Sequence, residues 1–421
     1  MKNVFWALAV ACSMATPAAV EIVAPKSGET VPLLSSGQKA YLALPLAERR
    51  AWLCDEKRRQ EMKSYGWLPQ KVELRWKADA AAEVKLFLGE KCVFATNGVR
   101  DAVSVDNLEI ARTYTWTVAA GGDLARGSFR TEDVAPRLLR IEGVPNARDF
   151  GGRIGLGGRR VRQGRVFRTA GLNKNAKAVC LGEKELRTAW AEGRLEATIA
   201  ATVDRGNGQP HDAKHWTKKI AKYFEEGKPL KKDYTRLFAV PGKQIPGDEC
   251  LTPSSRSFLL DVLGVKSDID LRSDFECFGM TGSPLGPSVK WFHYSSLSYA
   301  SVQKEKGKEA FSKVFKVFLD ERNYPIDFHC IAGQDRTGTV AFILNGLLGV
   351  DEDELYRDWE MSAFWNGRPN FNHKNKFDKL VASFETYPGN NLRERLESFV
   401  KSLDFTDKDL STFREIMLEQ R

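Results

Sequence analysis

The sequence predicts an α/β domain with a central, largely parallel sheet flanked by helices, preceded by a small all-β sandwich. Short alternating runs separated by turn residues fill the stretch from about 70 to 133, as is typical of an antiparallel sandwich. After residue 137, apolar strand-like runs interleave with helix-like runs, which indicates a parallel sheet covered by helices. The 421 residues, 42% of them hydrophobic, suffice for two or three domains with cores of their own.

The chain begins with a segment typical of an export signal. Lys2 supplies a positive start, residues 4–11 form an apolar run, and small residues follow. Because that run is too short for a permanent membrane span, residues 1–19 are predicted to be a signal peptide. The mature protein is then expected to be periplasmic or secreted, with no integral membrane segment. Lipoprotein anchoring at Cys12 is a secondary alternative, because Ala9 stands where a leucine-like residue is usual.

Residues 20–69 are expected to form a helical or irregular segment ahead of the sandwich. Pro45 sits where a helix can start and Gly66 where one can end, so the sequence predicts a helix over 45–65.

Residues 70–133 carry the strands of the predicted sandwich. Four runs alternate apolar and polar side chains or are rich in strand-forming residues: 72–77, 84–88, 114–118 and 127–131. Trp76 and Trp116 are the expected core aromatics. The pattern resembles a fibronectin type III-like domain, and this resemblance favours a spacer or positioning module over a dedicated receptor-binding site.

The α/β domain is expected to cover residues 137–421. Its predicted strands include 265–271 and 326–329, and its predicted helices include 337–348, 352–365 and 392–400. A charged insertion at about 176–250 carries further predicted helices at 181–195 and 213–226. The insertion is either a lid over the site or a surface elaboration, and both interpretations stay open.

Charge and cysteine usage limit the classes of partner. The net charge of +9 is spread along the chain, which gives a diffuse field that favours anionic ligands. No aromatic-plus-basic ladder or zinc-finger spacing points to nucleic acid. The seven cysteines show no paired metal spacing, and in an exported protein some of them can form disulfides whose connectivity sequence does not give.

The stretch from Pro325 to Phe342 carries the strongest chemical signal. It reads as an apolar strand, a tight loop that begins with Cys330, and a helix that begins after Arg336. A helix N-terminus and a nearby cation favour the thiolate of a cysteine, and inward backbone N–H groups can hold a tetrahedral anion. Arg336 can bind two phosphate oxygens in a fork. The predicted substrate-binding residues of the loop are Ile331, Ala332, Gly333 and Gln334.

This loop resembles that of the protein tyrosine phosphatase superfamily, which has a cysteine, five residues, an arginine and a hydroxyl residue. The matching residues are His329, Cys330, Gly333, Arg336, Thr337 and Gly338. Other segments resemble the bacterial tyrosine/serine phosphatase branch in the same order: 146–152, 164–170, 269–276 and 358–362. The resemblance spans about two thirds of the chain.

The resemblance implies a phosphate monoester hydrolase that acts on phosphotyrosine, with phosphoserine and phosphothreonine left open, through a cysteinyl-phosphate intermediate. Cys330 would be the nucleophile, Arg336 would bind the phosphoryl group, and Thr337 would hydrogen-bond the sulfur. The branch places its proton donor inside the loop, which here is Asp335. No cofactor or metal is expected, because the arginine and the amides supply the positive field.

Three further candidates and two rival functions stay open. Asp270 and Arg272 either contact the substrate or form a structural ion pair, and His329 either orients the loop or is a satisfied histidine at a strand end. Gln334 stands where the branch often has a lysine that helps phosphoinositide binding. The loss of that cation makes highly anionic inositol substrates less favoured, although Lys or Arg residues of the insertion could substitute. The runner-up function is a phosphoinositide or inositol-phosphate phosphatase, and the alternative from another class is a catalytically weak phosphoprotein-binding module. The expected partner is a phosphorylated protein or a small phosphomonoester.

Overall fold

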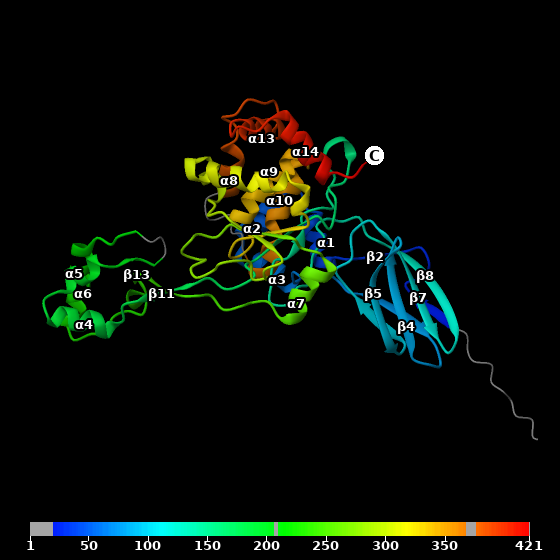
Figure 1. Cartoon of the computed structure of the whole chain (residues 1–421), viewed down its shortest axis with the longest axis horizontal. Coiled ribbons are helices and arrows are strands. Elements are labelled where there is room, and N and C mark those ends of the chain that lie inside the picture. Colours follow the sequence, from blue (N-terminus) through cyan, green and yellow to red (C-terminus); the bar gives the residue numbers. More distant parts are fainter. Residues whose placement is uncertain (1–19, 206–208, 368–375, 421) are drawn as a thin grey trace, which may run out of the picture. The chain divides into compact units, whose positions relative to one another are not determined.

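The computed structural model describes residues 20–205, 209–367 and 376–420 (Figure 1). The chain divides into two compact units, the first made of residues up to Tyr41 together with Leu68–Arg140 and the second of Leu42–Trp67 and Ile141–Arg421. The predicted signal peptide, residues 1–19 with Cys12, lies outside the described residues.

The first unit consists of two sheets that share one hydrophobic core. Their strand orders are β1-β3-β6 and β2-β8-β7-β4-β5. The strands are β1 (Glu21–Ala24), β2 (Glu29–Val31), β3 (Val72–Lys77), β4 (Ala82–Leu88), β5 (Lys91–Val99), β6 (Ala102–Val105), β7 (Thr113–Ala120) and β8 (Asp123–Thr131). Along β3 buried and exposed residues alternate strictly, because successive side chains of a strand point to opposite faces. Trp76 and Trp116, predicted as core aromatics, are 2% and 0% exposed and lie in the shared core.

The limits of the first unit differ from the predicted limits of 70–133. β1 pairs with β3 and β2 pairs with β8, so residues before 70 belong to the sheets. The helix α1 (Ser36–Leu42) follows them. The predicted helix over 45–65 is instead two helices of the second unit, α2 (Leu46–Cys54) and α3 (Glu56–Ser64). The two helices separate at Asp55, where the backbone is extended. The Asp55 carboxylate caps α3, because it accepts a hydrogen bond from the Arg58 N–H.

A five-stranded sheet of order β15-β14-β16-β10-β9 forms the centre of the second unit. Its strands are β9 (Arg148–Asp149), β10 (Val166–Thr169), β14 (Ser267–Asp270), β15 (Lys290–His293) and β16 (Ile326–His329). All neighbours are parallel except β9 with β10, which confirms the largely parallel sheet. β14, β16 and β10 are buried along their whole length, as expected for strands covered on both faces.

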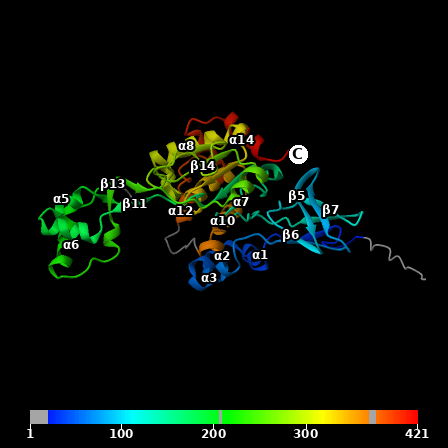
Figure 2. The ribbon, with the colours of Figure 1, turned by 60° about the horizontal axis from the view of Figure 1, so that its bottom comes forward.

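Helices pack around this sheet (Figure 2). They are α7 (Pro253–Ser257), α8 (Glu305–Phe318), α9 (Arg336–Leu347), α10 (Glu352–Glu360), α11 (Ala363–Asn366), α12 (Lys376–Ala382), α13 (Leu392–Lys401) and α14 (Asp407–Met417), with short helical turns η1 (Leu156–Gly158), η3 (Phe258–Val262), η4 (Tyr299–Gln303) and η5 (Glu321–Asn323). α9 is buried from Thr337 onward and packs against β16, α10 and α13. Phe318 of α8 contacts Phe328 of β16 and Phe413 of α14. The sheet and α9 thus form the rigid base from which the candidate loop springs.

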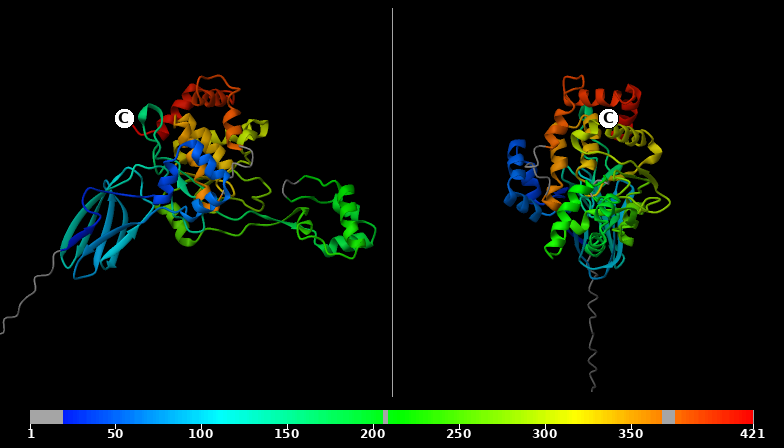
Figure 3. Two further views of the ribbon diagram at one scale, coloured as in Figure 1. Left: turned by 180° about the vertical axis from the view of Figure 1, so that it is seen from behind. Right: turned by 90° about the vertical axis from the view of Figure 1, so that its left-hand side faces the viewer.

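The insertion lies between β10 and β14 in the chain (Figure 3). It has a small hydrophobic core of its own. Its elements are β11 (Lys177–Cys180), α4 (Glu183–Ala191), α5 (Leu195–Ala200), β12 (Val203–Asp204), α6 (Ala213–Glu225), η2 (Tyr234–Arg236) and β13 (Phe238–Ile245). The strands form an antiparallel sheet of order β11-β13-β12. Apolar residues of all three helices meet, among them Leu186, Ile199 and Phe224. The insertion is therefore a folded element rather than an irregular loop.

Two findings concern membrane-spanning helices and disulfide bonds. None of the helices in the described residues combines the length and the apolar character that a membrane crossing requires. None of the six described cysteines forms a disulfide: Cys54, Cys92, Cys180, Cys250, Cys277 and Cys330.

Candidate active site

The loop between β16 and α9 holds its carbonyl groups outward. Each carbonyl oxygen from 331 to 335 accepts a hydrogen bond from outside the loop or from α9, at 2.7–3.1 Å. The donors, in order, are the Gly171 N–H, the Asn146 side chain, the Arg168 side chain, the Gly338 N–H and the Thr339 N–H. Since the N–H of a trans peptide points opposite to its carbonyl, the amides of this loop turn inward.

The inward amides have no acceptor among the described residues. Among the described residues, none of the backbone N–H groups of Ile331, Ala332, Gly333, Gln334 and Asp335 donates a hydrogen bond to the protein. Buried backbone donors normally have partners, and a ring of successive N–H groups at a helix N-terminus is an anion-binding concavity. The loop therefore presents the donors that a tetrahedral oxyanion requires.

Gly333 is required by this backbone. Its φ is +63°, a region that glycine enters at little cost. A Cβ atom at this position would lie 2.3 Å from the Thr169 carbonyl oxygen. Any other residue would push the loop away from β10 and disturb the ring of amides.

Cys330 lies at the entrance to the ring and is buried, with 2% of its surface exposed. Burial raises the pKa of its thiol, but the charge of Arg336 and hydrogen bonds from the Thr337 hydroxyl and N–H outweigh burial and lower the pKa. The Thr337 hydroxyl oxygen is buried and has no other partner in the part of the chain that is described, so it is available to the sulfur. These contacts favour the thiolate, the nucleophilic form.

Arg336, the first residue of α9, is held by a carboxylate. Its Nη1 and Nη2 atoms donate to the two oxygens of Glu276 at 2.6 and 3.1 Å, and Nη1 also lies 3.4 Å from the Leu271 carbonyl. Such a fork-to-fork pair fixes the guanidinium plane. Because the pair uses one edge of the guanidinium, the remaining N–H groups stay available for a ligand in the loop.

Asp335 is bound by an aromatic hydroxyl from η4. The Tyr299 hydroxyl donates to Asp335 Oδ1, and the Trp359 indole N–H donates to the Tyr299 oxygen at 3.3 Å. Tyr299 is almost buried and has a φ of +54°, unusual for a bulky residue. Its own N–H donates to the Thr339 hydroxyl at 2.7 Å. Burial and the Asp335 charge raise the pKa of Tyr299, so the hydroxyl remains a donor. The carboxylate is thereby fixed through one oxygen, and the other is left for a ligand.

A buried carboxylate of α10 supports the loop from behind. Asp358 pairs with Arg148 at 3.1 Å, with Arg153 at 3.0 Å and with Arg168. Arg168 in turn donates to the Gly333 carbonyl at 2.7 Å. The loop conformation is thus tied through Arg168 to β10 and α10.

His329 lies below the loop, within a buried group of carboxylates. Its Nε2 atom is 3.0 Å from Asp268 and its Nδ1 atom is 3.9 Å from Asp270. Burial lowers the pKa of His329, but the two carboxylates outweigh burial and raise it to about 9. Burial raises the pKa of neighbouring Asp327 to about 7. Asp268, Asp327 and His329 are close enough together to hold a metal ion. The ion pairs of His329 with Asp268 and Asp270 also fit a second interpretation, in which the group is a charge-balanced base for the loop.

Asp270 and Arg272 form an ion pair at 2.6 Å, and both side chains are fully buried. Arg272 also donates to Asn173 at 2.8 Å. Neither lines the cavity beside Arg336. Their complete burial in an ion pair fits the alternative of a structural pair.

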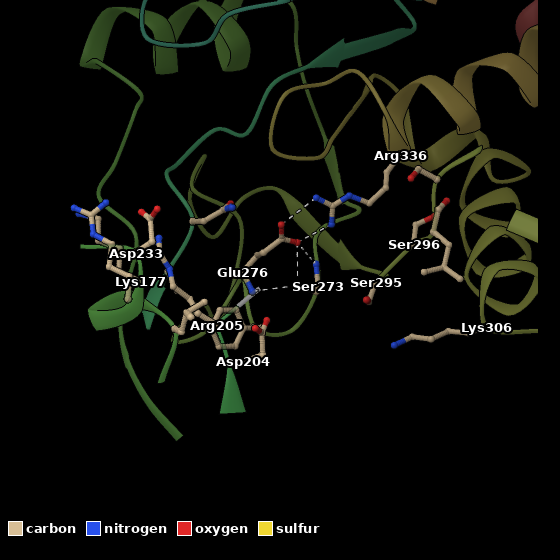
Figure 4. Close-up of a pocket in the computed structure, with 17 residues that line it drawn as sticks. Lys177, Asp204, Arg205, Asp233, Ser273, Glu276, Ser295, Ser296, Lys306 and Arg336 are labelled. Atoms are coloured by element: carbon tan, nitrogen blue, oxygen red, sulfur yellow. Dashed lines mark hydrogen bonds and ion pairs between the residues drawn. The ribbon is translucent and has the colours of Figure 1, made fainter. Parts of the chain in front are cut away.

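A cavity of about 970 Å³ opens beside Arg336 (Figure 4). Its walls come from the turn that carries Ser273 and Glu276, from the 295–298 segment, from Lys306 of α8 and from the insertion. It is a polar and strongly charged cavity that reaches from the loop arginine to the insertion.

The comparison with protein families decides the membership of the chain. A model described as "Tyrosine phosphatase family" matches residues 139–188 and 249–419, which is more than half of the chain. The chain belongs to the tyrosine phosphatase family. The family match includes the whole loop from Cys330 to Thr337 and omits residues 189–248.

Two curated relatives point the same way. The chain is 31% identical over 140 residues to a tyrosine-protein phosphatase of Nostoc commune, covering 28% of this chain and 47% of that protein. It is 26% identical over 230 residues to a Cupriavidus necator protein provisionally named as a tyrosine-protein phosphatase, covering 52% of this chain and 61% of the relative. Each match thus spans about half to three fifths of the relative.

Among solved structures, the core catalytic domain of the PP-IP phosphatase SIW14 from S. cerevisiae aligns with a TM-score of 0.22 and 17% identity. The alignment covers 32% of this chain and 83% of that domain. An alignment this weak carries no argument about substrate or fold.

The structure thus brings the predicted loop residues, from Cys330 to Thr337, into one site. Sequence reasoning did not include Glu276 or Tyr299, which hold Arg336 and Asp335. Glu276 lies in the 269–276 motif, so its acidic side chain within that motif was the feature that could have indicated a partner for Arg336. Tyr299 has no comparable signal.

Proposed function

We propose that the protein is a cysteine-dependent phosphate monoester hydrolase of the protein tyrosine phosphatase type. The observation that carries the proposal is the set of inward amides between Cys330 and Arg336, next to a thiol whose pKa is lowered by Arg336 and Thr337. Those donors match the equatorial oxygens of a phosphoryl group, whose charge must be stabilised in the transition state.

In the first step, the Cys330 thiolate attacks phosphorus and the bond between phosphorus and the leaving oxygen breaks. Asp335, in its acid form, gives its proton to that oxygen. The S–P bond formed holds the phosphoryl group as cysteinyl-phosphate. Tyr299 holds one carboxyl oxygen of Asp335, which leaves the other for the leaving group.

In the second step, water attacks phosphorus and the S–P bond breaks. Asp335, now a carboxylate, takes the proton from the water and returns to its acid form. The Thr337 hydroxyl and Arg336 stabilise the departing thiolate, as they lower the pKa of the free thiol. Phosphate leaves, and no external reductant, oxidant or metal takes part.

The test is a substrate panel with matched cysteine variants. We expect the protein to release phosphate from a generic aryl phosphate and from phosphotyrosyl peptides. Cys330→Ser should abolish turnover, while Cys54→Ser, which removes an exposed thiol outside the loop, should not. Full activity in Cys330→Ser would reject the mechanism. Phosphoseryl peptides and inositol phosphates complete the panel and separate the phosphoprotein proposal from the inositol-phosphate alternative.

A binding module would behave differently in the same panel. It would bind phosphopeptides with similar affinity before and after Cys330→Ser and would release no phosphate. The inward amides and Arg336 suit binding as well as catalysis, but a thiol with a lowered pKa and a carboxyl group fixed beside it suit catalysis.

We further propose that the protein is exported through its first 19 residues and that residues 70–133, within the two-sheet unit, form a fibronectin type III-like spacer. The basis is the sequence pattern of the N-terminus and the two sheets of the first unit. We also propose that the catalytic domain belongs to the bacterial tyrosine/serine phosphatase branch. Fusing the N-terminal segment to an enzyme that is active only outside the cytoplasm tests export, and a signal that requires Cys12 would indicate a lipid anchor instead.

A further inference from the structure

The cavity beside Arg336 is larger than the scissile phosphate requires. Its volume of about 970 Å³ lies at the upper end of the roughly 300–1,000 Å³ that a drug-sized ligand needs. Arg336 is the lining residue that belongs to the Cys330–Arg336 loop motif, and it accounts for one end of the cavity only. The rest of the cavity must therefore face the part of a substrate that is not transferred.

Three cationic side chains stand around the outer part of this cavity. Lys306 comes from α8, Arg205 follows β12, and Arg236 ends η2, and all three are exposed at the cavity wall. Among the described residues, none of them forms a salt bridge. Figure 4 shows Lys306 pointing into the hollow from the side of Arg336 and Arg205 on the opposite wall. We call these three residues the outer cation group.

The other charged residues of the cavity are two cations that are already in ion pairs and the acidic residues. Lys177 lies 3.4 Å from Asp248, and Arg336 is bound to Glu276. Asp204 and Asp233 also line the insertion side. The cavity keeps an excess of positive charge next to the phosphate site, and field lines in a hollow concentrate the attraction for anions.

The insertion positions two members of the group. β12 pairs with β13, and the Arg205 N–H donates to the Leu237 carbonyl at 3.1 Å. This contact places Arg205 beside the residue that follows Arg236. Both arginines lie in residues 189–248, which the family model does not match. They are additions of this chain to the site that the family shares.

We propose that the outer cation group binds a second anionic group of the substrate, phosphate or carboxylate, and so selects polyanionic phosphomonoesters. The proposal rests on the proposed function, since it concerns the substrate of the same site. Arginine suits both anions, because its fork binds two oxygens at once. Acidic phosphopeptides and multiply phosphorylated polyols share this chemistry.

The experiment compares matched substrates and matched variants of the full chain. One pair of phosphotyrosyl peptides differs only in flanking Glu or Gln residues, and a second pair compares an inositol polyphosphate with an inositol monophosphate. The variants are Arg205→Gln/Arg236→Gln and Lys306→Gln. The control is Lys214→Gln/Lys218→Gln, which removes two exposed cations of α6 that do not line the cavity.

We expect the parent to prefer the more anionic member of at least one pair. In Arg205→Gln/Arg236→Gln, the ratio of kcat/KM between the two members should fall about tenfold, because single exposed ion pairs are weak but several act here on one group. Lys306→Gln should lower the ratio less. The control variant should keep the kcat/KM ratio of the parent protein. Salt at about 0.5 M should bring the ratio of the parent closer to one, because salt at roughly this concentration screens exposed charges. The pair that responds identifies the source of the second anion.

Two results would overturn the proposal: a parent ratio near one in both pairs, or an equal fall in the control, which would indicate a general field. Binding of the same peptides to Cys330→Ser gives a readout that does not need turnover. The protein could show a binding preference that depends on Arg205 and Arg236 and yet hydrolyse none of the substrates. That result would support the role of the outer cation group and reject the proposed function.

Discussion

Asp358→Asn is expected to be the most damaging single substitution outside the loop. Asp358 is buried and is the shared acceptor for Arg148, Arg153 and Arg168. Burial raises the pKa of Asp358, but the three arginines outweigh it and hold the pKa well below its ordinary value. A depressed carboxyl pKa means that the stabilisation is fully present above the ordinary value of about 3.9 and is lost as pH falls through the folded-state value.

At neutral pH the substitution leaves buried guanidinium groups without their carboxylate. Breaking a buried pair by removing one partner costs about 3–5 kcal/mol, which is a large part of a typical unfolding free energy of roughly 5–15 kcal/mol. For a unit of this size, roughly 2–4 °C is lost per kcal/mol, so Tm should fall by roughly 6–20 °C. Since Arg168 also holds the Gly333 carbonyl, kcat should fall as well.

Thermal and urea unfolding followed by circular dichroism measure the loss of stability, and aryl phosphate turnover below the new Tm measures the loss of activity. The matched control is Asp248→Asn, an exposed carboxylate with two lysine partners at 3.4 and 3.5 Å, which should match the parent because exposed pairs contribute little. If Asp358→Asn unfolded at the same temperature as this control, the account of the buried network would be refuted.

Three further predictions concern the site itself. Glu276→Gln should lower kcat/KM on an aryl phosphate about tenfold, because the fork that orients Arg336 becomes a neutral contact; an unchanged value in steady-state assays would show that Arg336 needs no support. Tyr299→Phe removes the hydroxyl that holds Asp335 and should reduce turnover of alkyl phosphates about tenfold but that of activated aryl phosphates much less, and equal losses on both would argue against a role through the proton donor. Iodoacetamide should inactivate Cys330 at pH values below those at which N-acetylcysteine reacts, because the pKa of its thiol is lowered, and inorganic phosphate should protect; a pH profile that matches N-acetylcysteine would contradict the thiolate.

Sequence could predict the loop because its chemistry is local. Cys330, the amides, Arg336 and Thr337 lie within one strand-loop-helix unit, and spacing along the chain fixes their arrangement. The partners of that loop are remote, since Glu276 and Tyr299 stand 60 and 36 residues away from Arg336 and Asp335. Their contacts depend on how the turns pack against the sheet.

The differences in the fold have a similar origin. β1 and β2 are only four and three residues long, and their pairing is supplied by β3 and β8 far along the chain, so no local pattern marks them. The predicted helix over 352–365 contains a break between α10 and α11, just as Asp55 divides the helix over 45–65. In both cases the average helical pattern is right, and a local backbone choice decides the boundary.

The two ends of the insertion lie side by side. The Lys174 N–H donates to the Asp248 carbonyl at 2.8 Å and Asn173 bridges Glu249, while at Gly247 even one added carbon atom would collide with the Lys174 carbonyl at 1.6 Å. A segment whose two ends are held together in this way can be replaced by another segment, because a short turn could join the same ends. Under the proposed function, an exchanged insertion would change substrate preference and leave Cys330 and Arg336 in place.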